Sequence, residues 1–107
     1  MTDHLRVLWD ILALREQNIL CNAGHHPDFE VRSGFGEWES EPFPRQLVDK
    51  GMLLEIKRGV SMVTYSLTNL AADMLSSMPD DLKVQWWPLP KDIVRLKAHL
   101  ATRHRDA

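Results

Sequence analysis

The chain has 107 residues, of which 44% are hydrophobic and 26% charged, and this suits a single globular domain rather than a disordered chain. No apolar stretch approaches the roughly 20 residues that span a bilayer, and the first residues lack the basic and apolar runs of a secretory signal. The single cysteine, Cys21, excludes an internal disulfide, so we expect a protein of the reducing cytoplasm.

The net charge of −2 is unevenly distributed. Residues 1–90 hold 8 Lys and Arg against 13 Asp and Glu, whereas residues 91–107 hold 5 against 2. A basic end on an acidic body indicates an anionic partner, but it is equally typical of a solvated helix end.

The first predicted element is one long helix. Apolar residues from Leu5 to Ile19 recur at helical spacing, Trp9 falls among them as a core residue, and Gly24 suits the end of the helix. Three more apolar residues widen this surface, so we expect the helix to be covered on two sides: Val7, Ile11 and Leu14.

Residues 25–41 carry glycines and a proline that predict a loop or short irregular strands. Within them Glu37, Glu39 and Glu41 alternate along the sequence around Trp38. If this segment is extended, the three glutamates point to one side.

A short helix is predicted next, because Pro44 suits a first helical turn and Gly51 suits a helix end. Leu47 and Val48 supply its inward face. Four polar residues should lie on its outer side: Arg45, Gln46, Asp49 and Lys50.

A β-hairpin is predicted over residues 53–67, with its turn near Gly59. We expect four of its side chains to pack against the first helix: Leu54, Ile56, Tyr65 and Leu67.

Thr68 should then cap a helix that Pro79 closes, with an apolar face of Leu70, Met74, Leu75 and Met78. A last helix begins near Pro90. Its stripe of Ile93, Leu96 and Leu100 needs cover, which a two-fold partner would supply most simply, so we expect a homodimer in which the first helix also takes part. The alternative is that this helix folds back on its own domain.

Two short stretches resemble known proteins. Leu47-Val48-Asp49-Lys50-Gly51-Met52-Leu53 resembles the end of the recognition helix and the first wing strand of winged-helix proteins. Tyr65-Ser66-Leu67-Thr68-Asn69-Leu70-Ala71 resembles the Tyr-x-Leu-Thr-x-x-Gly that closes the wing in MarR-type and PadR-type regulators, with Ala71 in place of the glycine.

The resemblance implies an α+β, mainly α, fold: a winged-helix domain over residues 1–78, with a helical core and a two-stranded wing. Residues 79–107 then form a linker, a Trp-rich segment and a C-terminal helix that packs on the domain or on a dimer partner. It further implies a DNA-binding transcriptional regulator. Arg45, Gln46 and Lys50 would face DNA from the helix, and Lys57 and Arg58 would reach phosphates from the wing.

The sequence departs from this pattern where a helix should precede residues 40–50, because an acidic segment rich in glycine stands there. The alternative is that this helix comes from the end of the first segment, around Gln17 to Ala23. Glutamates near phosphates oppose DNA binding. The alternative is therefore a winged-helix module that binds a protein, such as an accessory or inhibitor protein of a phage or mobile element. Its interface would use Glu37, Trp38, Glu39 and Glu41, together with Trp86 and Trp87, which serve equally well as core residues.

Little in the sequence predicts catalysis or metal binding. Cys21, His25, His26 and Asp28 are close in sequence, but a zinc site needs about four ligands and adjacent histidines rarely share one ion. Cys21 has apolar neighbours, as a small core residue does. No phosphate loop, nucleophile elbow or dinucleotide motif is present, so we expect neither an enzyme nor a cofactor.

Overall fold

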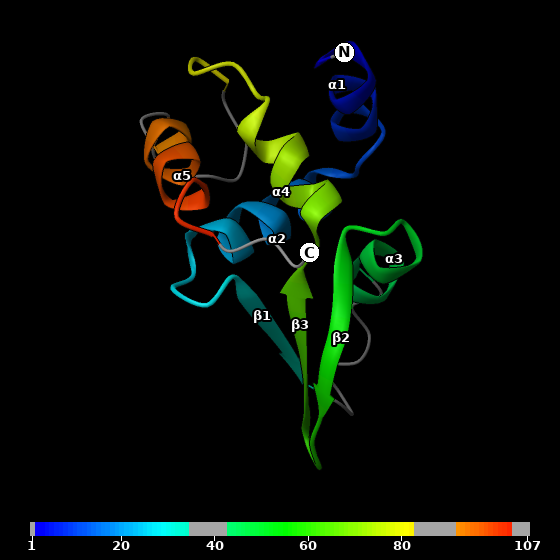
Figure 1. The fold of residues 1–107 in the computed structure, drawn as a ribbon. Coiled ribbons are helices and arrows are strands. Elements are labelled where there is room, and N and C mark those ends of the chain that lie inside the picture. The colour runs from blue at the N-terminus through cyan, green and yellow to red at the C-terminus, as the bar shows by residue number, and fades with distance from the viewer. Residues whose placement is uncertain (1, 35–42, 83–91, 104–107) are drawn as a thin grey trace.

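The computed structural model describes residues 2–34, 43–82 and 92–103, and these form an α+β arrangement (Figure 1). The helices are α1 (Thr2–Asp10), α2 (Leu14–His25), α3 (Phe43–Asp49), α4 (Asn69–Ser76) and α5 (Asp92–Leu100). The strands are β1 (Glu30–Gly34), β2 (Leu53–Arg58) and β3 (Met62–Leu67), which form one antiparallel sheet in the order β1-β3-β2.

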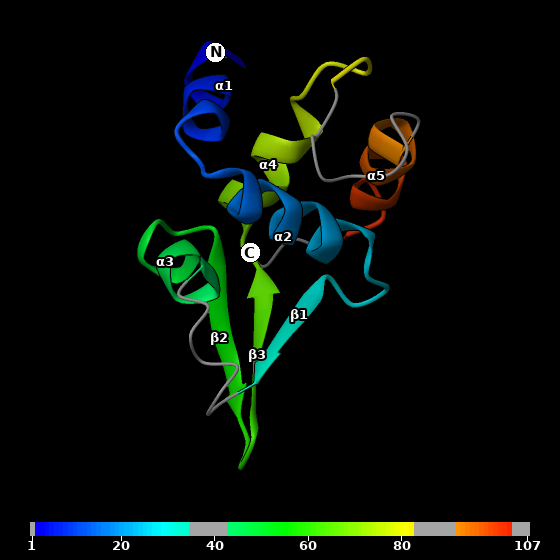
Figure 2. The same ribbon diagram turned by 180° about the vertical axis from the view of Figure 1, so that it is seen from behind.

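The helices and the sheet occupy opposite ends of the molecule. Figures 1 and 2 show the helices gathered at one end, with α2 running across the top of the sheet and α3 beside β2. The far half of the β2–β3 hairpin extends beyond every labelled helix. The expected α+β class and the single hairpin are therefore present, and β1 adds a third strand to the hairpin.

The predicted first helix is in fact two helices, because the chain turns at residues 11–13 between α1 and α2. The buried Glu16 carboxylate accepts a hydrogen bond from the Ala13 amide at 2.9 Å and so caps the start of α2. Trp9 is buried as expected, and its carbonyl accepts a bond from the Gln17 side chain at 3.0 Å.

The expected cover over the first helix is absent among the described residues. Val7, Ile11 and Leu14 are all exposed in the structure. Val7 lies on α1, Ile11 in the turn after it and Leu14 at the start of α2, so the three do not belong to one helix as expected.

The hairpin was predicted correctly in its extent but not in all of its buried side chains. Gly59 donates its amide to the Met62 carbonyl at 2.8 Å and closes the turn. Tyr65 and Leu67 are buried as expected, but Leu54 and Ile56 are exposed. Leu53 lies opposite Leu67 and takes the inward place, and a register irregularity follows between Glu55 and Lys57.

The short helix and the helix after the hairpin agree with their sequence signals. Gly51 follows α3 with a φ of +79°, which only glycine adopts freely. The Thr68 hydroxyl accepts the Ala71 amide and caps α4. Leu70, however, is exposed rather than part of the buried face of α4.

The C-terminal helix α5 folds back on its own domain, against α2 and α4. Its stripe of Ile93, Leu96 and Leu100 is at most 6% exposed, so the stripe gives no reason for a dimer and that argument was wrong. The approach to α2 is close: a Cβ on Gly24 would lie 2.3 Å from a Leu96 methyl carbon. His99 Nδ1 also lies 2.8 Å from the Gly24 carbonyl oxygen.

Arg103, three residues beyond the end of α5, ties this end of the chain to the sheet. Arg103 donates to the Leu67 carbonyl at 2.6 Å and also to the Asn69 side chain. Phe29 stacks on His99 with ring centres 4.5 Å apart. In the described residues, no helix has the length and apolar character needed to cross a membrane.

Candidate nucleic-acid interface

The helix α3 presents two of the predicted DNA-contacting side chains to solvent. Pro44 and Leu47 are buried and fix the helix against the body, whereas Arg45 and Gln46 are exposed. Neither exposed side chain forms a hydrogen bond or ion pair with another described residue. Both are therefore available to a ligand that approaches this side of the molecule.

Lys50, predicted to face DNA with them, is held by the body instead. Its ammonium lies 2.8 Å from both carboxylate oxygens of Glu16, whose side chain is only 2% exposed. Because a buried carboxylate requires a partner, Lys50 serves to link α3 to the start of α2. Sequence reasoning missed Glu16, since nothing local distinguishes it from a solvated helix residue.

The two cations predicted at the wing lie on opposite faces of the sheet. Lys57 pairs in register with Thr64, and Arg58 pairs with the buried Val63. Since cross-strand partners share a face, Arg58 lies on the face of the sheet that carries the core. Lys57 lies on the other face, which we call the open face. Arg58 also forms an exposed ion pair with Glu55 at 2.7 Å.

A third cation near the hairpin, Arg32 on β1, was not predicted as a site residue from the sequence. It lies on β1 opposite Thr64, so the pairing of β1 with β3 brings it to the same face as Lys57. No local signal marks Arg32, because only the strand order β1-β3-β2 places it there.

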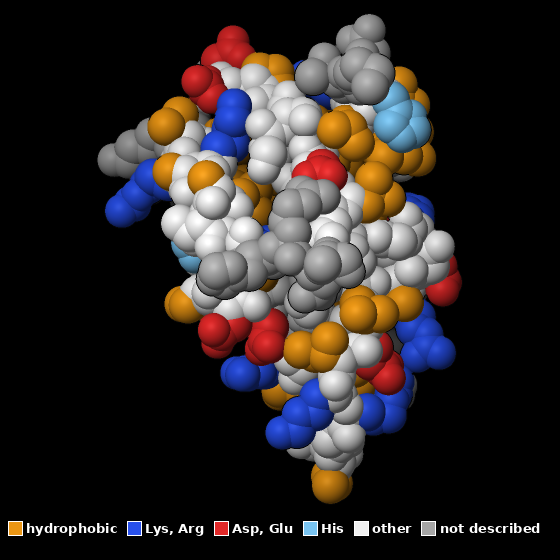
Figure 3. Space-filling model, viewed as in Figure 1, with side chains coloured by type: hydrophobic (Ala, Val, Ile, Leu, Met, Phe, Trp, Pro, Cys, Tyr) orange, Lys and Arg blue, Asp and Glu red, His pale blue; other side chains and the backbone are white. Residues whose placement is uncertain are grey.

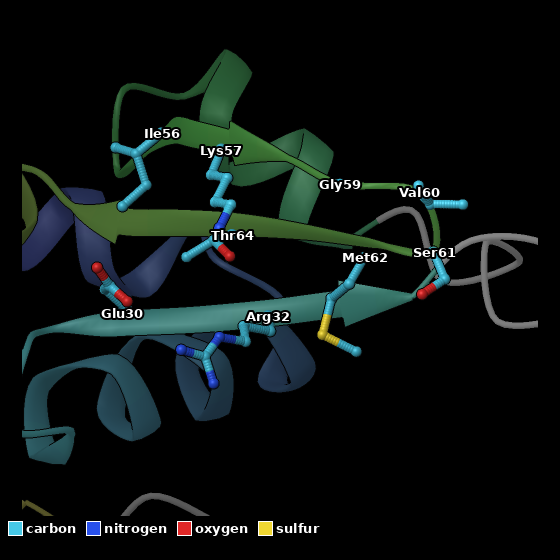
Figure 4. A pocket seen from close by; sticks show the side chains of 9 residues that line it. All are labelled: Glu30, Arg32, Ile56, Lys57, Gly59, Val60, Ser61, Met62 and Thr64. Carbon is cyan, nitrogen blue, oxygen red and sulfur yellow. The ribbon is translucent and has the colours of Figure 1, made fainter.

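These residues line a shallow hollow of about 480 Å³ on the open face of the sheet (Figure 4). Figure 4 shows the Arg32, Lys57, Thr64 and Met62 side chains on one side of the three strands, with Val60 at the hairpin end. The hollow is lined by two cations, two hydroxyls, apolar side chains and one carboxylate, that of Glu30. It is suited to an anionic ligand that also has apolar surface.

The surface around the hairpin is mixed in charge. Figure 3 shows Lys and Arg side chains around the far half of the hairpin, with acidic and hydrophobic side chains interspersed. Glu30, Asp49 and Glu55 are the acids that lie on the elements of this region. Among the described residues of this region, Lys and Arg are therefore interspersed with acids and do not form a continuous basic stripe.

The other predicted site residues divide into two groups. The proposed protein interface of Glu37, Trp38, Glu39, Glu41, Trp86 and Trp87 lies outside the described residues. Cys21 is buried, and burial raises the pKa of its thiol from 9.0 to about 12. His26 Nδ1 accepts the Asp28 amide at 3.1 Å. In the part of the chain that the structure describes, no three His, Cys, Asp or Glu side chains are grouped to hold a metal ion.

Comparisons with protein-family models, with curated proteins and with solved structures found no match to this chain.

Proposed function

We propose that this protein binds duplex DNA as a small regulator of the winged-helix type, with α3 and the β2–β3 hairpin as its contact surface. One observation carries the proposal: a hairpin that extends past the helical body has cations on both faces and stands beside a helix with free Arg45 and Gln46 side chains. The order α2, β1, α3, β2, β3 agrees with a helical core followed by a wing.

The dimensions of DNA suit this surface. The major groove is about 12 Å wide and admits one helix or a two-stranded ribbon. Arg45 and Gln46 belong to the first turn of α3, where side chains reach base edges. Lys57 and Arg58 leave the hairpin in opposite directions and can contact phosphates on either side of it.

The charges of the region define what kind of DNA binding to expect. Arg58 must exchange Glu55 for a phosphate, which costs little because an exposed ion pair contributes about 0–1 kcal/mol. Asp49 and Glu55 repel phosphates. We therefore propose moderate affinity that depends on base contacts from α3, rather than tight binding to any duplex.

Fluorescence anisotropy with labelled duplexes at several salt concentrations tests this proposal. Lys57→Ala should weaken binding to all duplexes alike and lower the salt slope by about one unit. Gln46→Ala should cost about 1–3 kcal/mol on a preferred site and much less on random DNA. The matched control is Arg95→Ala, which removes an exposed cation from α5, away from the hairpin.

If the wild-type protein binds no duplex even at low salt, where phosphate attraction is strongest, this proposal fails. Equal losses for Lys57→Ala and Arg95→Ala would show a general charge effect and no interface at the hairpin.

We also propose a homodimer, now through α1 and not through the stripe of α5. Val7, Ile11 and Leu14 remain exposed near the turn between α1 and α2, and a second copy would cover them. Ile11→Glu should leave the fold intact. At roughly tens of micromolar protein, it should lower the mass measured by light scattering from that of a dimer to that of a monomer. A monomeric wild-type protein at that concentration would contradict the proposal.

A further inference from the structure

The open face of the sheet exposes several large apolar side chains to solvent. Leu54 and Ile56 of β2 and Met62 of β3 are 59%, 47% and 44% exposed. Val60 stands fully exposed at the end of the hairpin. The opposite face carries the buried Val63, Tyr65 and Leu67, and only charged side chains of β2, Glu55 and Arg58, are exposed on it. The apolar side chains of that face are therefore covered, whereas those of the open face have no cover among the described residues.

Two cations cross this open face in one row. Arg32 on β1 and Lys57 on β2 both pair in register with Thr64 on the central strand. Adjacent strands lie about 4.8 Å apart, so the two cationic residues stand roughly 10 Å apart with a hydroxyl between them. Neither cation forms an ion pair or hydrogen bond with another described residue. Arg58, on the other face, has Glu55.

We propose that this open face binds an acidic amphipathic helix of a protein partner. The apolar side of that helix would cover Leu54, Ile56 and Met62, and its carboxylates would pair with Arg32 and Lys57. A helix is about 10–12 Å across, which matches the separation of the two cationic residues. Helices cover sheet faces in α/β packing, so the partner would complete a layer that this chain leaves open.

The residue types favour a protein over a nucleic acid at this face. A phosphate backbone would satisfy Arg32 and Lys57 but would leave the three apolar side chains in water. Among the described residues that line the hollow on this face, none is an aromatic side chain on which a base could stack. Lys57 is shared with the proposed DNA contact, but the peptide proposal does not depend on DNA binding, because Arg32 and the apolar side chains of this face take no part in that contact and α3 and Arg58 lie outside it.

Synthetic helical peptides provide the probe. The first peptide has about 18 residues, with leucines at i, i+3, i+4 and i+7 and glutamates on both flanks of that stripe, and the second replaces each glutamate with lysine. The acidic peptide should bind by fluorescence anisotropy and shift backbone amide resonances of residues 30–34, 54–57 and 62–66. The basic peptide should do neither, because like charges repel.

Variants of the protein sharpen the result. Arg32→Glu and Ile56→Glu should each weaken the acidic peptide roughly tenfold, and Arg32→Gln should weaken it less. Arg95→Glu and the pair Arg45→Ala with Gln46→Ala should leave peptide binding unchanged. Circular dichroism melts verify that each variant is folded. If Arg32→Glu does not fold, Arg32→Gln tests the same side chain.

Three results would overturn the proposal. The first is the absence of acidic-peptide binding at about 1 mM, a concentration that detects even the weakest specific contacts. The second is equal binding of the acidic and basic peptides, or unchanged binding by Arg32→Glu. The third is a duplex DNA of about 20 bp that shifts the resonances of residues 30–34 and 54–56 as strongly as the peptide does, which would make this face a nucleic-acid surface. Failure of DNA binding at α3 alone would leave this proposal standing.

Discussion

The helical body and the far half of the hairpin differ in where their side chains find partners. In the body, Leu20, Met74 and Leu96 are at most 1% exposed, and even the polar Gln17 bonds within the chain. On the hairpin, β2 buries only Leu53, and Lys57 has no partner among the described residues. The body thus completes its own packing, whereas the hairpin keeps apolar and charged groups exposed. Partners should act on the second region and mutations should destabilise the first.

Two leucines of the same hairpin, one buried and one exposed, test the difference between the two regions most strongly. Leu67 is 1% exposed and Leu54 is 59% exposed. Leu67→Ala should lower the free energy of unfolding by about 2–5 kcal/mol, because it leaves a cavity in the core. Leu54→Ala should change it by less than about 0.5 kcal/mol. Urea denaturation measures both, and equal losses would show that the open face is also structural.

The link between α2 and α3 should give the next largest effect. Lys50→Ala leaves the buried Glu16 carboxylate without its ammonium, which should cost on the order of 1–3 kcal/mol in urea denaturation, since Lys50 is itself partly exposed. The double variant Glu16→Gln with Lys50→Ala should recover part of that loss. A stable Lys50→Ala protein with weaker DNA binding would instead place Lys50 in the interface.

The smallest effect near neutral pH concerns the thiol in the body. Burial raises the pKa of Cys21 to about 12, so the native protein should hold almost no thiolate at pH 8. A disulfide reagent should label it only as fast as the body opens. Because the unfolded chain releases this proton near its ordinary value of 9.0 and the folded chain does not, Cys21 should reduce stability as the pH rises above 9 towards 12. Fast labelling of folded protein at pH 8 would contradict the burial of Cys21.

Local sequence signals were enough to predict the features that a single residue determines: a helix end, a tight turn and a helix start. Gly51, Gly59 and Thr68 marked the end of α3, the hairpin turn and the start of α4, and the structure confirms all three. These features depend on backbone freedom or on a hydroxyl near a helix start, which a single residue type reveals.

Features that depend on distant partners were predicted wrongly or missed. The turn after α1 has no glycine or proline, and the Glu16 side chain that caps α2 is held by Lys50, 34 residues away. Leu53, Leu54 and Ile56 are all apolar, and alternation led us to predict Leu54 and Ile56 as the inward residues, whereas the pairing of Leu53 with Leu67 places Leu53 there.

The candidate site was predictable only in part for the same reason. Arg45 and Gln46 were expected on the exposed side of α3, where the structure places them. The separation of Lys57 from Arg58 onto opposite faces follows from strand pairing, and so does the position of Arg32 beside Lys57. Residue spacing within one strand does not indicate which neighbour a third strand will supply.

The most direct test of the account is to map where a duplex touches the folded protein. Backbone amide resonances should be followed while a duplex of about 20 bp is added, at low salt and again at roughly 200 mM salt. We predict that shifts concentrate on residues 43–49 and 57–62, leave α5 unchanged and largely disappear at the higher salt. Shifts centred on α5, or none at low salt, would contradict the claim that the hairpin and α3 form the functional surface.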